Sequence, residues 1–105
     1  MNTRRLSAII ILLPALAACG DSARDTRAHE FIDACMSSGN LERPMCECLA
    51  DKAGRELSPA GFDLLIASLQ GNDEKANELR AQLEMPELMK TGMFMVNAPS
   101  ECTGQ

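Results

Sequence analysis

Five cysteines are the residues best able to do chemistry in this 105-residue sequence. Cys46 and Cys48 form a Cys-Glu-Cys group, which could take part in thiol–disulfide exchange or hold a soft metal ion. A thioredoxin-type redox site has two residues between its cysteines and lies in a βαβ unit, and a zinc site needs paired ligand clusters. Neither pattern is present, so structural disulfides are the favoured interpretation and a thiol-redox factor is the weaker alternative.

The single histidine offers a second candidate site. His29 has Asp25 and Asp33 four residues before and after it, on one face of a predicted helix. A carboxylate in that position could orient a general base. The same pattern also arises on a solvated helix face with weak i,i+4 pairs. Because no motif places a nucleophile nearby, we expect no catalytic residue and no enzyme.

A series of methionines offers a third candidate site. Met85, Met89 and Met93 are four residues apart, and their thioethers would suit Cu(I). Methionine also commonly fills irregular cores, and we expect this use here, with no metal and no cofactor. A third interpretation is that Phe94 and Met95, which lie off the main stripe, belong to an exposed apolar patch for a partner. Cu(I) handling by the three methionines remains the alternative function.

The first 19 residues are typical of an export signal. Arg4 and Arg5 precede an apolar run over residues 6–15, and small residues follow it. The run is too short to cross a hydrocarbon core of roughly 30 Å, which needs about 20 residues. The sequence therefore predicts a cleaved signal peptide and no retained membrane-spanning helix at this end.

The end of this signal, Leu16-Ala17-Ala18-Cys19, resembles the lipobox of bacterial lipoproteins. The resemblance implies cleavage after Ala18 and acylation of Cys19, which would anchor the protein to a membrane on the periplasmic side. In proteobacterial lipoproteins an Asp directly after the cysteine tends to retain the protein in the inner membrane. Here Gly20 follows the cysteine and the Asp comes one place later, so the resemblance favours the outer membrane.

Assigning Cys19 to lipid leaves an even set of four cysteines for two disulfides. Three pairings are open. Cys46 and Cys48 would point about 200° apart on a helix and should not bond to each other. We favour Cys35–Cys46 with Cys48–Cys102, because the first two lie on inward stripes and Cys48 lies where a surface tail can reach it. The swapped pairing remains close behind.

The charge of the mature chain excludes several kinds of partner. Residues 1–18 hold two arginines and no acid, so 10 − 2 = 8 Lys and Arg face 15 Asp and Glu, a net charge of −7. This argues against nucleic acid and against electrostatic adhesion to anionic lipid, leaving acyl chains as the membrane attachment. With three Phe, no Trp and no Tyr, there is little material for a base-stacking or sugar-binding platform.

Helical periodicity runs through the mature part and predicts an all-α domain. We expect a bundle of four to five short helices stapled by two disulfides: about 25–38, 44–57, from 58 to 70, from 72 to 85, and 86–98, with Pro99 ending the last and Cys102 in a tail. Residues 1–18 would be the signal peptide, 19–24 the lipidated cysteine and a short polar tether, and 25–105 the helical domain. The predicted inward residues of the last helix are Met85, Leu88, Met89, Gly92, Met93 and Val96.

The mature part is also similar to a loose group of small exported proteobacterial proteins. Cys35, Cys46, Cys48, Ser58-Pro59 and Cys102 carry this resemblance. It supports the fold and implies no activity. Taken together, the sequence favours a non-enzymatic envelope lipoprotein that acts by contact with an unknown protein at the periplasmic membrane face.

Overall fold

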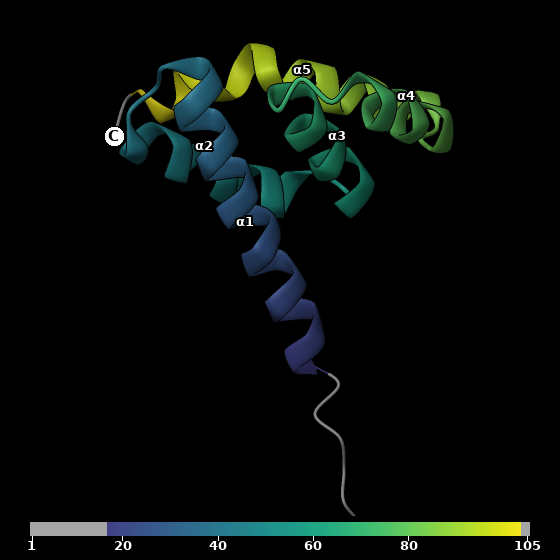
Figure 1. The fold of residues 1–105 in the computed structure, drawn as a ribbon, viewed down its shortest axis with the longest axis horizontal. Coiled ribbons are helices and arrows are strands. Elements are labelled where there is room, and N and C mark those ends of the chain that lie inside the picture. Colours follow the sequence, from purple (N-terminus) through teal and green to yellow (C-terminus); the bar gives the residue numbers. More distant parts are fainter. Residues whose placement is uncertain (1–16, 104–105) are drawn as a thin grey trace, which may run out of the picture.

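The computed structural model describes the backbone of residues 17–103, with side chains from Ala23 onward. In this range the chain forms five helices and no strand (Figure 1): α1 (Ala17–Gly39), α2 (Arg43–Glu56), α3 (Pro59–Leu69), α4 (Asp73–Gln82) and α5 (Met85–Cys102). The predicted all-α bundle is confirmed. Most of the predicted signal peptide, and the side chain of Cys19, lie outside the described residues.

Local signals place the helix boundaries close to the predicted positions. The hydroxyl of Ser58 accepts a hydrogen bond from the Gly61 N–H at 3.1 Å and so caps α3. The side-chain oxygen of Asn72 caps α4 in the same way, accepting from the Lys75 N–H at 3.2 Å. Between these helices Gly71 has a φ of 73°, a left-handed conformation that favours glycine. The α3–α4 turn is therefore determined by its own residues.

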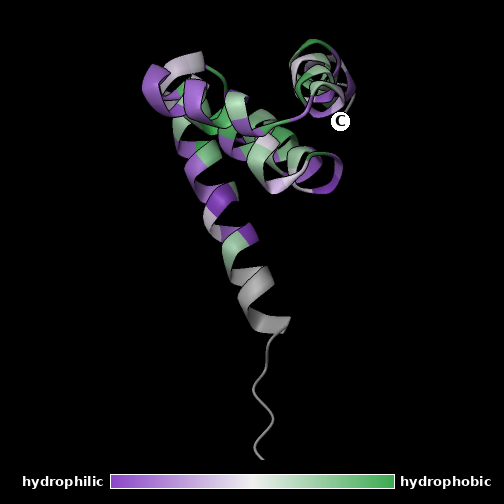
Figure 2. Cartoon of the chain, turned by 90° about the vertical axis from the view of Figure 1, so that its right-hand side faces the viewer, coloured by the Kyte–Doolittle hydropathy of each residue, from purple (hydrophilic) through white to green (hydrophobic). Residues whose placement is uncertain are grey.

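α2 and α3 form the centre of the arrangement. α1 packs against both, α5 packs against both, and α4 packs on α3. The N-terminal turns of α1 project from the body, while α5 lies at the opposite end of the molecule in both views (Figures 1 and 2). None of the helices in the described range is both long enough and apolar enough to cross a bilayer.

The main core lies where α1, α2, α3 and α5 meet. Phe31 of α1 and Phe62 of α3 are both buried, with ring centroids 5.7 Å apart. Hydrophobic residues gather between the helices, and hydrophilic residues cover much of α1 (Figure 2). A smaller core joins α3 and α4. The apolar residues on one side of α2 and at its C-cap are all buried: Cys46, Leu49, Ala50, Ala53 and Leu57.

Both disulfides follow the pairing favoured from the sequence. Cys35 bonds to Cys46 and joins α1 to α2, and Cys48 bonds to Cys102 and joins α2 to α5. Within these bonds Cys46 and Cys48 have different partners, so they do not form a dithiol pair with each other.

Two helix ends differ from the prediction. α1 begins at Ala17, so residues 20–24 are helical where a polar coil was expected. α5 continues through Pro99 to Cys102, so the expected stop at the proline is wrong. A proline inside a helix removes one backbone hydrogen bond. Here the burial of Ala98 and Cys102, together with the bond from Cys102 to Cys48, holds the last turn in place.

Candidate interaction surface

α5 has two apolar faces, and only one of them is buried. The buried face consists of Thr91, Phe94, Ala98 and Cys102, each no more than 5% exposed. These residues recur at intervals of three and four and so share one side of the helix. Cys102 faces α2 through its disulfide, which sets the rotation of α5 about its own axis.

The opposite face carries the methionines. Met85, Met89, Met93 and Val96 are 66%, 63%, 53% and 70% exposed. Together with Gly92, which lies among them, we call these residues the outer stripe. The prediction that they face the core is wrong. Because both faces of α5 are apolar, periodicity alone could not decide which one packs inward, and the larger side chains lie on the exposed one.

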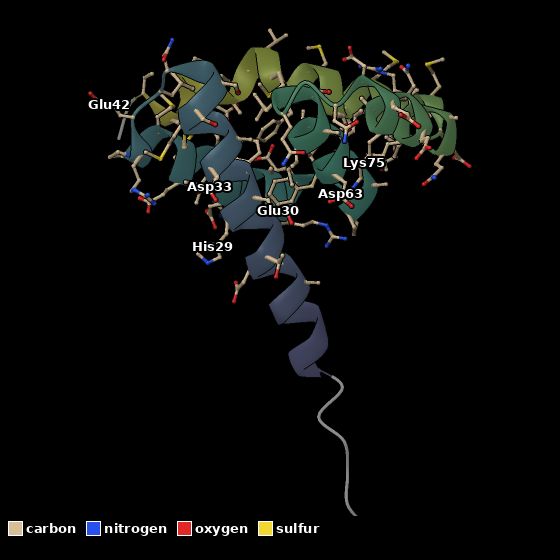
Figure 3. The ribbon with its side chains drawn as sticks, viewed as in Figure 1. His29, Glu30, Asp33, Glu42, Asp63 and Lys75 are labelled. Atoms are coloured by element: carbon tan, nitrogen blue, oxygen red, sulfur yellow. A yellow bond between two sulfur atoms is a disulfide. The ribbon has the colours of Figure 1, made fainter. Side chains whose placement is uncertain are left out.

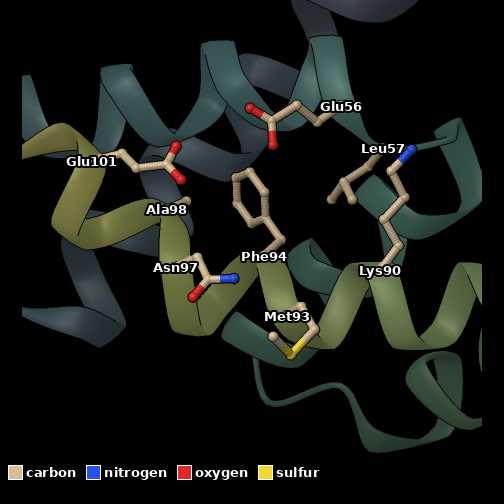
Figure 4. Close-up of a pocket in the computed structure, with 8 residues that line it drawn as sticks. All are labelled: Glu56, Leu57, Lys90, Met93, Phe94, Asn97, Ala98 and Glu101. Atoms are coloured by element: carbon tan, nitrogen blue, oxygen red, sulfur yellow. The ribbon is translucent and has the colours of Figure 1, made fainter.

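The apolar patch suggested for Phe94 and Met95 is therefore only partly correct. Phe94 is buried, whereas Met95 is 38% exposed. Figure 4 shows Phe94 pointing from α5 towards Glu56 and Leu57 of the α2 end, while Met93 lies on a different side of the helix. An exposed apolar surface exists, but the outer stripe forms most of it.

A groove runs along each side of the outer stripe. The first, of about 180 Å³, lies between α5 and the end of α2 and is lined by Met93, Lys90 and Asn97, among others (Figure 4). The second, of about 240 Å³, lies between α5, α3 and α4 and contains Gly92 and Met95 in its lining. The stripe is thus a ridge between two shallow depressions.

Charges are balanced in the first groove. Lys52 Nζ lies 2.6 Å from Glu101 Oε2 and 3.1 Å from Glu56 Oε2, and both carboxylates line this groove. Hydrogen bonds to Glu101 and then to Glu56 raise the pKa of Lys52. Lys52 and Lys90 carry two positive charges, and the two carboxylates carry two negative ones. This side of the outer stripe therefore has no net charge.

The second groove contains one charged residue, Arg80 at the end of α4. Its Nη1 donates to the side-chain oxygen of Asn77 at 2.8 Å. Within the described part of the chain Arg80 forms no ion pair. The remaining lining is mostly apolar and includes Leu64, Leu65 and Leu88.

The histidine site does not assemble into a catalytic group. His29 is exposed on α1 and points away from the body of the protein (Figure 3). Asp33, on the same helix, is also exposed. Asp25 is exposed as well. Among the residues with described side chains, no cluster of three His, Cys, Asp or Glu could hold a metal ion.

One sequence signal could have revealed the outer stripe. Phe94, Ala98 and Cys102 are four residues apart, so a helix continuing through Pro99 places all three on one face. A disulfide at Cys102 then turns that face inward. A helix that ends at the proline lacks this constraint, and the apolar stripe that the methionines share with Leu88 and Val96 then predicts that they face the core.

No family model, curated protein or solved structure matches the chain. The fold and surface define a small, disulfide-bonded, all-α domain that presents an apolar ridge on its last helix.

Proposed function

We propose that this protein is a non-enzymatic envelope lipoprotein that acts by contact with another protein through the outer stripe of α5. The lipobox-like stretch ending at Cys19 supports export and acylation. The two disulfides are typical of an oxidising compartment. The favoured location is the periplasmic face of the outer membrane.

The exposed outer stripe is the observation that carries this proposal. A helix that is apolar on opposite faces is normally covered on both. Here one face is buried against α2 and α3, and the other leaves Met85, Met89, Met93 and Val96 more than half exposed. A contiguous exposed apolar surface of this kind is typical of a binding site.

The position of the stripe indicates a protein partner. If Cys19 carries the acyl chains, the N-terminal turns of α1 face the bilayer. α5 lies at the other end of the molecule (Figure 1). Its outer stripe is opposite the buried face that packs on α2 and α3. The bilayer that holds the anchor therefore cannot cover the stripe, and a partner in the periplasm can.

Acylation is tested by mass spectrometry of the wild-type protein and the Cys19→Ser variant, both expressed with the full signal. We expect the wild type to carry the mass of the acyl chains and to fractionate with membranes, and the variant to lose both properties. An unacylated wild-type Cys19 would overturn the lipoprotein assignment.

Contact is tested by crosslinking in intact envelopes, with Met89→Asp compared with the wild type. We expect a discrete crosslinked partner that is lost in the variant. Leu41→Asp is the matched control, because Leu41 is also exposed and apolar but precedes α2, away from the outer stripe. Equal crosslinking in all three proteins would contradict a contact through α5.

Cu(I) handling remains the second candidate, and one observation favours it. Because Met85, Met89 and Met93 are exposed, their thioethers are accessible to a soft ion instead of being enclosed in a core. Competition with a chromogenic Cu(I) chelator tests this. Retention of copper by the wild type but not by a Met89→Leu, Met93→Leu double variant would support the metal site, since leucine keeps the apolar surface.

A further inference from the structure

The residues around the outer stripe indicate which kind of protein surface can bind there; this inference rests on the proposed function. We propose that the stripe binds an amphipathic α-helix of another protein, and that this helix carries a carboxylate on the flank that faces Arg80.

The spacing of the stripe favours a helical partner. Met85, Met89, Gly92 and Val96 are separated by four, three and four residues, the pattern of a helix–helix seam. The stripe spans 11 residue steps, about 17 Å of helix. No atom would lie within 4 Å of a Cβ placed on Gly92, so the middle of the seam is open to an incoming side chain. A partner helix of about three turns would match this length.

The positive charge of Arg80, in the second groove, indicates which charge a partner should carry beside the outer stripe. On the other side of the stripe, the groove that contains Lys90 is already neutral, because the carboxylates of Glu56 and Glu101 balance Lys90 and Lys52. In the second groove Arg80 is the single charged residue and has no carboxylate partner within the described chain. A guanidinium beside an apolar seam suits a carboxylate, which it can bind through two parallel hydrogen bonds. The preference is therefore for an acidic flank on one side of the partner helix.

A second copy of this chain fits the surface poorly. In an antiparallel self-pairing the Arg80 side of one stripe faces the Arg80 side of the other, and in a parallel one it faces the Lys90 side. The antiparallel arrangement brings Arg80 towards Arg80 across the seam, which opposes association. The parallel arrangement brings Arg80 to a side whose carboxylates are already balanced by Lys52 and Lys90, so it offers Arg80 no spare negative charge.

The test uses the full mature lipidated protein in phosphatidylcholine nanodiscs and three labelled helical peptides of about 15 residues. The peptides share one apolar stripe and carry Glu, Gln or Lys along one flank. We expect affinity in the order Glu, Gln, Lys, with at least about a fivefold difference between Glu and Lys peptides. Arg80→Glu should reverse the order. Lys75→Glu, an exposed charge change elsewhere on α4, should leave it unchanged.

The other outcomes separate this inference from the proposed function. Equal binding of the three peptides, abolished by Met89→Asp, would overturn the acidic partner and leave contact through α5 in place. Failure of every peptide to bind would overturn the helical partner, and envelope crosslinking would then decide the contact function by itself. Self-association, or burial of the stripe in lipid, that Met89→Asp removes would replace the partner with a second copy or a membrane.

Discussion

Cys48 and Cys102 are joined across 54 residues of sequence, with their Cα atoms 6.0 Å apart. This bond ties the middle of α2 to the last turn of α5. It holds a helical turn that contains Pro99 and determines which face of α5 is buried. The exposed methionines, and with them the proposed contact surface, depend on this one connection.

The two disulfides should differ in their contributions to stability. In the chain-entropy model a bond that closes 54 residues contributes about 4 kcal/mol and one that closes 11 contributes about 3 kcal/mol. Replacing both Cys48 and Cys102 by Ala should therefore lower the free energy of unfolding more than replacing both Cys35 and Cys46. Urea unfolding of the two double variants measures this, and the opposite order would contradict the model.

Neighbouring residues on α5 should respond to truncation in opposite ways. Phe94→Ala should lower the free energy of unfolding by about 3–5 kcal/mol, because it removes a buried ring. Met93→Ala should change it by no more than about 0.5 kcal/mol, because Met93 is exposed. Thermal or urea unfolding distinguishes them. A large effect at Met93 with a small one at Phe94 would show that α5 is rotated from the orientation described.

Gly61 should not tolerate a side chain. A Cβ built on Gly61 would lie 2.7 Å from the hydroxyl oxygen of Thr91, which is buried on α5 and donates to the Glu87 carbonyl at 2.8 Å. Gly61→Ala should therefore destabilise the fold by about 1–3 kcal/mol.

The same measurement includes a rescue and a control. Adding Thr91→Ala to Gly61→Ala should recover part of the loss, because it removes the hydroxyl that the new methyl group meets. Gly92→Ala, in open space on the same helix, should instead be neutral or stabilising by up to about 1 kcal/mol. Additive effects at Gly61 and Thr91 would contradict the clash.

The Lys52 ion pairs should stabilise the fold only while the amine is charged. Hydrogen bonds to Glu101 and Glu56 raise the pKa of Lys52 above its ordinary value of 10.5. A raised pKa in the folded state means that this contribution is fully present below 10.5 and is lost as the pH rises through the folded-state pKa. The stability difference between the wild type and Lys52→Gln should therefore hold from pH 7 to 9 and shrink above 10.5. A difference that grows with alkaline pH would contradict this assignment.

The helices and most of the core could be predicted from local chemistry. The Ser58 and Asn72 caps and the Gly71 turn act over a few residues, so their effects are visible in the sequence. A helix with a single apolar face, such as α2, can pack against the core in only one orientation. The even cysteine count and the angle between Cys46 and Cys48 similarly narrowed the disulfide pairing. The lipobox at Cys19 remains a prediction of the sequence.

The orientation of α5 is the feature that only the tertiary structure decided. Its two faces are both apolar, so hydrophobic periodicity gave no preference for the correct one. A long-range constraint decides the orientation of α5, because Cys102 must reach Cys48 on α2. Phe94 and Ala98 lie on the same face as Cys102 and are therefore buried with it. Met85, Met89 and Met93 are consequently exposed, because a helix of fixed pitch cannot bury opposite sides against the same neighbours.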